Sequence, residues 1–290
     1  MLNKEQKSAI KHGNGPLLIV AGAGTGKTTV ITERIKHLVS AGLAKPEEIL
    51  ALTFTEKAAS EMEERVDRIM PYGYTQMWIM TFHSFCDRVL RADASHIGYD
   101  ASYKLLTQGQ SLKLLRDNIF NLGLNYFRPL GNPNKFLWGL LTHFSRLQDE
   151  NITPKEYLSW VKKQKVVSSK QKAKEEELEI KKWKELASAY KIYQDIKIKN
   201  SYFDFGDLIT KTIELFEKRP NVLSTYRKKF KYILIDEFQD TNYSQNKLAI
   251  ALAGKNGNIT VVGDDDQAVY RFRGAAVSNI LQFRKNFPKT

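Results

Sequence analysis

Residues 22–29 read Gly-Ala-Gly-Thr-Gly-Lys-Thr-Thr, and this stretch decides the fold. An apolar run, residues 17–20, precedes it, and a helix-like run, residues 30–39, follows it. The order of strand, glycine-rich turn and helix is typical of a phosphate-binding loop. Glycines let the backbone curl so that successive N–H groups face an anion, and the helix N-terminus adds partial positive charge. The stretch therefore predicts a nucleotide site on an α/β fold.

The loop supplies the residues that we expect to bind the nucleotide. Lys27 is expected to reach the β and γ phosphates, and the Thr28 hydroxyl to ligate Mg²⁺. The expected nucleotide-binding residues of the loop are Gly22, Ala23, Gly24, Thr25, Gly26, Lys27, Thr28 and Thr29. Ala21 stands where the full pattern has glycine, a mild departure because a glycine follows directly. The alternative is a glycine-rich turn with an incidental lysine.

Acidic residues follow a later apolar run, residues 232–235, and suggest the other half of the site. Asp236 and Glu237 are adjacent carboxylates, as expected at the end of a strand in a nucleoside triphosphatase. Asp236 is expected to hold Mg²⁺ together with Thr28, and Glu237 to act as a general base. Gln267 follows a further apolar run and is expected to sense the γ-phosphate or the attacking water. A solvated acidic turn is the alternative reading of the carboxylates.

Size, charge and cysteine content limit the classes of protein to which this chain can belong. The 290 residues suffice for two domains of about 100–200 residues each. The net charge of +13 favours a polyanionic partner, with nucleic acid first, an anionic membrane surface second, and a plain excess of surface lysine as the alternative. No apolar run approaches the ~18–20 residues that cross a membrane, so no membrane partner is expected. The single cysteine, Cys86, fits a reducing cytosol, and we expect a cytoplasmic location.

The middle of the chain differs from its two ends. Residues 89–201 have mainly helical periodicity and hold 20 Lys and Arg against 12 Asp and Glu. We therefore expect a parallel-sheet core formed by residues 1–88 and 202–290, interrupted by an all-helical, DNA-contacting domain at residues 89–201. A solvated lysine-rich arm is the alternative reading of this insertion.

Two segments combine aromatic with polar side chains. Phe54 and Thr55 end a strand-like run, at the edge where parallel sheets bind ligands. Tyr270, Phe272 and Arg273 interleave rings with positive charge, which suits stacking on single-stranded bases beside phosphate contacts. Packing of these rings in the core is the alternative.

Six short blocks occur in a fixed order, at residues 2–6, 21–29, 52–59, 81–86, 235–240 and 262–275. Together they resemble the UvrD/Rep/PcrA group of superfamily 1 DNA helicases. The resemblance implies a P-loop NTPase with a RecA-like core, and a contact between Gln6 and adenine. It also implies a set of DNA-contacting residues, which are Phe54, Thr55, Thr81, Phe82, His83, Tyr270, Phe272 and Arg273.

The resemblance further implies ATP and Mg²⁺ as cofactors and an ATP-dependent 3′–5′ helicase or translocase on single-stranded DNA or 3′-tailed duplex. Family members continue into a second RecA-like domain that supplies arginines to the γ-phosphate. None follows Thr290, so we expect an N-terminal half with little ATPase activity and no unwinding by itself. Phe272 stands where the family usually has Trp, which implies a smaller stacking surface. The alternatives are the ATP-binding part of a helicase–nuclease subunit and a nucleotide-liganded module that binds single-stranded DNA.

Overall fold

The chain divides into two compact units. The structure, a computed structural model, describes residues 2–22, 24–70, 77–166, 170–254, 257–264, 283–288 and 290. The first unit combines Met1–Ile97 with Lys211–Thr290, and the second is Gly98–Thr210. The sequence placed the divisions after residues 88 and 201, whereas the structure has them further along the chain. The helix Phe82–Asp93, which the first expected division would cut, stays whole within the first unit.

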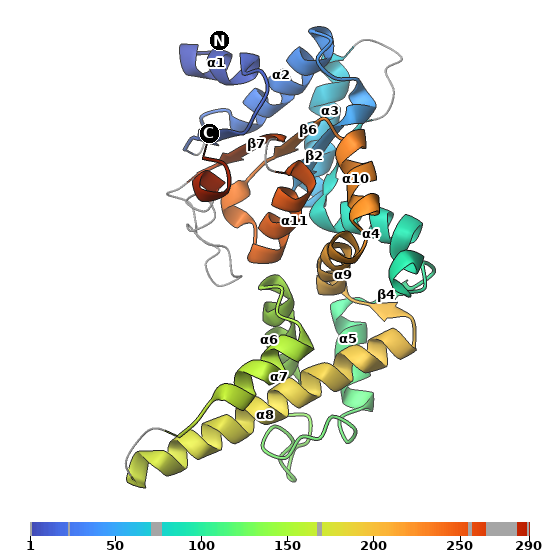
Figure 1. Cartoon of the computed structure of the whole chain (residues 1–290), viewed down its shortest axis with the longest axis vertical. Coiled ribbons are helices and arrows are strands. Elements are labelled where there is room, and N and C mark those ends of the chain that lie inside the picture. The colour runs from blue at the N-terminus through green and yellow to red at the C-terminus, as the bar shows by residue number, and fades with distance from the viewer. Residues whose placement is uncertain are drawn as a thin grey trace. The chain divides into compact units, whose positions relative to one another are not determined.

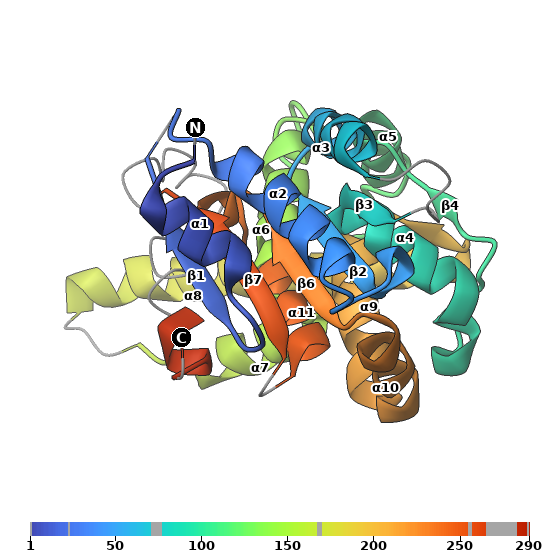
Figure 2. The same cartoon turned by 90° about the horizontal axis from the view of Figure 1, so that it is seen from above.

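The first unit is built on a parallel sheet of five strands. Their order is β1-β7-β6-β2-β3, as Figure 2 shows. The strands are β1 (Leu17–Val20), β2 (Ile49–Thr53), β3 (Trp78–Thr81), β6 (Tyr232–Ile235) and β7 (Asn258–Gly263). Every residue of β2 and β6 is buried, as expected of parallel strands that are covered on both faces. The predicted α/β class with a parallel sheet is confirmed.

Helices cover both faces of this sheet (Figure 1). They are α1 (Lys4–Lys11), α2 (Lys27–Ser40), α3 (Glu56–Ile69), α4 (Phe82–Asp93), α10 (Pro220–Lys229) and α11 (Tyr243–Ala253), with short 3-10 turns at Pro46–Glu48, Ala94–Ile97 and Phe238–Asp240. On one face, α2 and α3 pack through a core that includes Ile35 and Val66. At the β3 edge, Trp78 packs edge to face against Phe85 of α4 and Phe230. Both faces of the sheet are thereby shielded from water.

The second unit is mainly helical. Its elements are β4 (Lys104–Leu105), α5 (Gln108–Asp117), α6 (Leu137–Asp149), α7 (Pro154–Lys163), α8 (Lys170–Lys199), β5 (Tyr202–Phe203) and the start of α9 (Phe205–Lys218). One exception to the predicted helical character is β4, which pairs in parallel with β5 where the chain enters and leaves this unit. Leu105 was expected in a helix, but here its strand is paired, and Leu106 donates its N–H to the carbonyl of Phe203 at 2.7 Å. None of the described helices is both long and apolar enough to cross a membrane.

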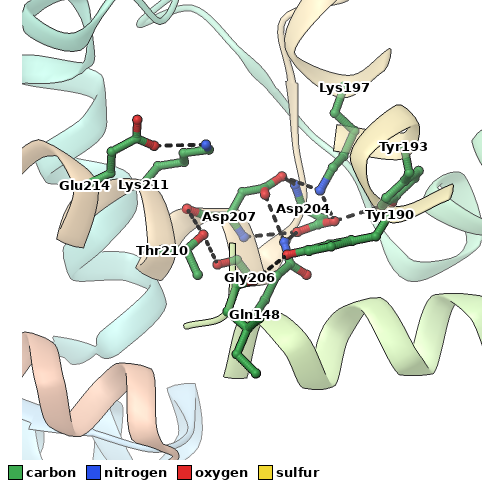
Figure 3. A network of polar contacts seen from close by, with 11 residues as sticks. Gln148, Tyr190, Tyr193, Lys197, Asp204, Gly206, Asp207, Thr210, Lys211 and Glu214 are labelled. Carbon is green, nitrogen blue, oxygen red and sulfur yellow. Dashed lines mark hydrogen bonds and ion pairs between the residues drawn. The ribbon is translucent and has the colours of Figure 1, made fainter. Parts of the chain in front are cut away.

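A buried ion-pair network holds the second unit together (Figure 3). Lys197 of α8 is fully buried, and its Nζ lies 2.5 Å from Asp204 Oδ2 and 2.6 Å from Asp207 Oδ2. Gln148 of α6 donates Nε2 to both carboxylates, at 2.9 and 2.8 Å. A Cβ atom at Gly206 would lie 2.5 Å from Gln148 Oε1, so this position favours glycine. Burial alone would lower the pKa of Lys197, but the two carboxylates outweigh it and raise that pKa above its ordinary value.

Replacement of Lys197 should therefore destabilise the second unit strongly. In Lys197→Met, both buried carboxylates lose their counter-ion, and we expect a loss of about 3–5 kcal/mol in the free energy of unfolding. Urea unfolding followed by tryptophan fluorescence would measure it. The matched control is Lys199→Met on the exposed side of the same helix, which should change stability by less than about 0.5 kcal/mol. Equal stabilities of the two variants would contradict this account of the network.

Candidate nucleotide-binding site

The ends of three strands bring the predicted nucleotide residues together. The loop that leaves β1 is tied to β7, because Ala21 donates its N–H to the carbonyl of Gly263 at 3.0 Å. Gly26 has φ +87°, in the left-handed region that glycine adopts without strain, and it precedes the first residue of α2. Lys27 and Thr28 therefore lie in the first turn of α2, at the edge of the sheet where β6 and β7 also end.

Lys27 is the centre of the polar contacts. Its side chain is 8% exposed, and its Nζ lies 3.5 Å from Glu237 Oε2 and 3.5 Å from Asp264 Oδ2. A buried ammonium needs such partners, because removing it from water is costly. Next to it, Thr28 donates its hydroxyl to Asp236 Oδ2 at 3.1 Å. The structure thus brings together the predicted catalytic residues Lys27, Asp236 and Glu237, from helix α2 and the end of β6.

Among the described side chains of the site, negative charge exceeds positive charge. Three carboxylates, those of Asp236, Glu237 and Asp264, lie around one ammonium, that of Lys27. Burial, and then the neighbouring Glu237, raises the pKa of Asp236 above its ordinary value, against the opposing hydrogen bond from Thr28. A divalent cation would relieve this excess of negative charge.

The oxygen atoms present fit Mg²⁺. Thr28 offers a hydroxyl and Asp236 a carboxylate, which are hard ligands of the kind that Mg²⁺ prefers. Within the described part of the chain, no group of three or more His, Cys, Asp or Glu side chains could hold a metal ion. A site with few protein ligands still suits Mg²⁺, because this ion usually keeps several waters and binds phosphate oxygens.

Gln6 lies against the phosphate-binding loop. Its Nε2 donates to the carbonyl of Thr25 at 2.9 Å, and its Oε1 accepts from the N–H of Asn3 at 2.9 Å. A primary amide has a second hydrogen and its oxygen a second lone pair, which are the two groups that an adenine contact needs. The contact with adenine stays a prediction.

Arg34 anchors the helix that carries this glutamine, and sequence reasoning missed it. The guanidinium is 1% exposed and donates to the carbonyls of Ala9 (3.0 Å) and His12 (2.7 Å) at the end of α1, and to the Thr260 hydroxyl (3.0 Å). Burial lowers the pKa of Arg34 to about 10, so it remains charged at neutral pH. It thereby fixes α1, which carries Gln6, to α2 and β7. The signal in the sequence was a charged residue on the otherwise apolar face of α2.

Two more residues of the site were not predicted. Asp264 follows β7 directly, the same position that Asp236 has after β6, and this was the available signal. Gln239 is 2% exposed; it donates Nε2 to Glu237 Oε2 at 2.6 Å and accepts the N–H of Asp264 at 3.0 Å. The block at residues 235–240 includes Gln239 but gave it no role, because its role depends on the pairing of β6 with β7.

The predicted DNA-contacting residues that the structure describes divide into two groups. Thr55 is exposed and Phe54 half-buried, at the end of β2. Thr81 and Phe82 are 4% and 1% exposed. Thr81 caps α4 and donates its hydroxyl to Glu56 Oε1 at 2.8 Å, and the Phe82 ring packs in the core. The latter two side chains expose little surface in this structure, and the DNA contact expected of them stays a prediction.

His83 and the last block complete the comparison with the sequence. His83 is half-buried, and burial lowers its pKa below the ordinary value, against the charge of Glu56. Its predicted DNA contact stays a prediction. The other predicted residues lie outside the described part of the chain, and their roles stay predictions: Ala23, Gln267, Tyr270, Phe272 and Arg273.

Known proteins match this chain over almost its whole length. The sequence profile of the UvrD/REP helicase N-terminal domain matches residues 2–288. The "ATP-dependent DNA helicase PcrA" of Bacillus subtilis is 40% identical over 288 residues. The proteins of the same name from Staphylococcus aureus and Staphylococcus epidermidis are 38% identical over 288 residues.

Each of these three alignments covers 99% of this chain and 36% of the relative. The chain thus spans about a third of the length of the curated relatives that it matches. The profile match, the identity to these relatives and the arrangement of the site agree with the resemblance predicted from the six blocks. The chain belongs to the UvrD/REP helicase N-terminal domain family.

Proposed function

We propose that this chain binds ATP with Mg²⁺ and contributes the nucleotide-binding part of an ATP-dependent DNA helicase or translocase. The observation that carries the proposal is the convergence of Lys27 and Thr28 on Asp236, Glu237 and Asp264. A lysine and a hydroxyl on the first turn of a helix, facing acidic residues at neighbouring strand ends, form the arrangement that nucleoside triphosphatases use. The names of the relatives support the choice of ATP and DNA.

In the proposed reaction, Lys27 exchanges its carboxylate partners for oxygens of the β and γ phosphates. Thr28 and Asp236 would hold Mg²⁺, which supplies positive charge to the phosphates. Glu237 accepts a proton from a water molecule as the water oxygen bonds to the γ-phosphorus. The bond from that phosphorus to the bridging oxygen breaks, and ADP leaves with the electron pair. Gln267 is proposed to sense the γ-phosphate or the attacking water.

For the DNA partner, we propose single-stranded DNA or a 3′-tailed duplex. The exposed Thr55 and the half-buried Phe54 lie at the end of β2, on the same edge of the sheet as the nucleotide residues. We also propose that a second RecA-like domain supplies arginines to the γ-phosphate, so the 290 residues by themselves hydrolyse ATP slowly. Arginine contacts of this kind contribute about 10³–10⁵ in rate. A cytoplasmic location remains part of the proposal.

Removal of the Lys27 charge tests the nucleotide site directly. Lys27→Ala should weaken Mg²⁺·ATP binding about 10- to 100-fold, because hydrogen bonds to charged groups contribute about 1.5–3 kcal/mol. Titration with a fluorescent ATP analogue would measure the Kd. Lys36→Ala, an exposed lysine of the same helix, is the matched control and should bind as the unaltered chain does. If Lys27→Ala binds with unchanged Kd, the nucleotide lies elsewhere.

The raised pKa of Asp236 predicts a pH dependence of Mg²⁺ binding. Because the carboxyl takes up its proton at a higher pH than an ordinary aspartate (about 3.9), Mg²⁺ affinity should begin to fall at a correspondingly higher pH on acidification. Mg²⁺ titrations in the presence of the fluorescent analogue, from pH 8 down to the lowest pH at which the chain stays folded, would show the decrease. Asp236→Asn should bind Mg²⁺ weakly at every pH, whereas Asp195→Asn, on the exposed side of α8, should behave as the unaltered chain. A flat profile for the unaltered chain would contradict the prediction.

A dependence of DNA affinity on bound nucleotide would distinguish a motor component from a simple binding module. We expect the affinity for single-stranded DNA to differ by at least ~5-fold between the nucleotide-free and the nucleotide-bound chain, in the range of typical coupling energies. Fluorescence anisotropy with a labelled oligonucleotide, repeated over a series of salt concentrations, would measure it. Affinity that is indifferent to nucleotide would instead favour a DNA-binding module with ATP as a structural ligand.

A further inference from the structure

Gln239 is a buried amide between two parts of the site. It belongs to the 3-10 turn Phe238–Asp240 after β6 and is 2% exposed. One end of its amide contacts the side chain of Glu237, and the other contacts the backbone of Asp264 at the end of β7. A single side chain therefore connects the expected general base to the neighbouring strand.

The orientation of this amide follows from its partners. The backbone N–H of Asp264 can only donate, so the oxygen of the Gln239 amide must face it, at 3.0 Å. The NH₂ group then faces Glu237 Oε2, at 2.6 Å. An ionised carboxylate can only accept, and the pairing is therefore satisfied at both ends. Because the two partners are of opposite type, the amide has one favourable orientation.

Glu237 needs such support. Its side chain is 38% exposed, and its backbone has φ +49° and ψ +47°, a left-handed conformation that non-glycine residues rarely adopt and that concentrates at functional sites. Gln239 and Lys27 both contact Oε2 of this carboxylate. Among the described residues, no side chain contacts its Oε1, the oxygen that we assign to the water molecule.

We propose that Gln239 is a positioning residue: it holds the Glu237 carboxylate ready to accept a proton from water, and it ties that carboxylate to the end of β7. The inference rests on the proposed function, since it assigns Glu237 as the base of ATP hydrolysis. Asp264 directly precedes residues 265–274, the block expected to contact the γ-phosphate and DNA.

Two substitutions separate the two contacts of the amide. Gln239→Met has similar length but removes both hydrogen bonds. Gln239→Glu keeps an acceptor for the Asp264 N–H but places a second carboxylate against Glu237. We expect Gln239→Met to slow hydrolysis about 10- to 100-fold, the effect of losing a hydrogen bond to a charged group, with the Kd for Mg²⁺·ATP changed less than about 3-fold. Single-turnover hydrolysis of radiolabelled ATP by excess protein would give the rate.

The pH profile distinguishes positioning from a structural role. Like charges raise the pKa of a carboxyl pair, so the rate of Gln239→Glu should rise with pH over a higher range than the rate of the unaltered chain. Hydrogen exchange at the Asp264 amide supplies a readout that needs no hydrolysis. Its protection should be lost in Gln239→Met and kept in Gln239→Glu, because only the latter retains the acceptor.

The matched control is Gln245→Met. This glutamine is equally buried (2% exposed) and lies in the first turn of α11, where it caps the helix through Asn242 and does not contact the site. It should lose stability but keep the unaltered rate and pH profile at a temperature where it is folded.

The outcomes separate this inference from the function on which it rests. If the unaltered chain does not bind Mg²⁺·ATP, the proposed function is wrong and the inference fails with it. If the unaltered chain binds and hydrolyses ATP but Gln239→Met is equally fast, or Gln239→Glu has the unaltered pH profile, the inference alone is wrong. Unchanged protection of the Asp264 amide in Gln239→Met would overturn the tie to β7 even where hydrolysis is slow.

Discussion

Parallel strand pairing is the constraint on which the site depends. Because β6 pairs with β2 on one side and β7 on the other, segments that are far apart in the sequence end at one edge of the sheet. The hydrogen bond from Thr28 to Asp236 joins residues separated by 208 positions. A slip of β6 by one residue would turn its side chains to the opposite faces and remove Asp236 from the hydroxyl. The register of the sheet therefore determines whether Asp236 and Thr28 can contact each other.

Electrostatics then determines which ligand this edge accepts. The ammonium of Lys27 is nearly buried, and it lies between carboxylates on two different strand ends. Among the described side chains negative charge exceeds positive charge, which favours a polyanion that arrives with a cation. A phosphate loop alone would have less of this selectivity. It arises from Asp264 and Asp236 together, which only the folded sheet brings near the lysine.

The sequence predicted those features that are encoded locally. The glycines and Lys27 of the loop, the apolar strands and the carboxylates that follow β6 form contiguous patterns, and the structure brings them together. The packing of side chains is not encoded in that way. Gln239 and Arg34 act through partners on other strands and helices, and the Phe82 side chain is buried although it lies in a block expected to contact DNA. Their roles depend on tertiary contacts, which a pattern of neighbouring residues does not contain.

The short parallel pair of β4 and β5 has a consequence for how the chain folds. The two strands bring together points of the chain that are roughly 100 residues apart, and closing a flexible loop of that length costs about 4 kcal/mol in chain entropy. When the second unit folds, the contacts formed within it, including this pairing and the Lys197 network, offset the loss of chain entropy. Once the second unit has folded, the entropy cost of bringing the two segments of the first unit together is that of a short loop. Nucleation in the insertion is thus expected to accelerate assembly of the sheet, whose strand pairings are otherwise remote in the chain.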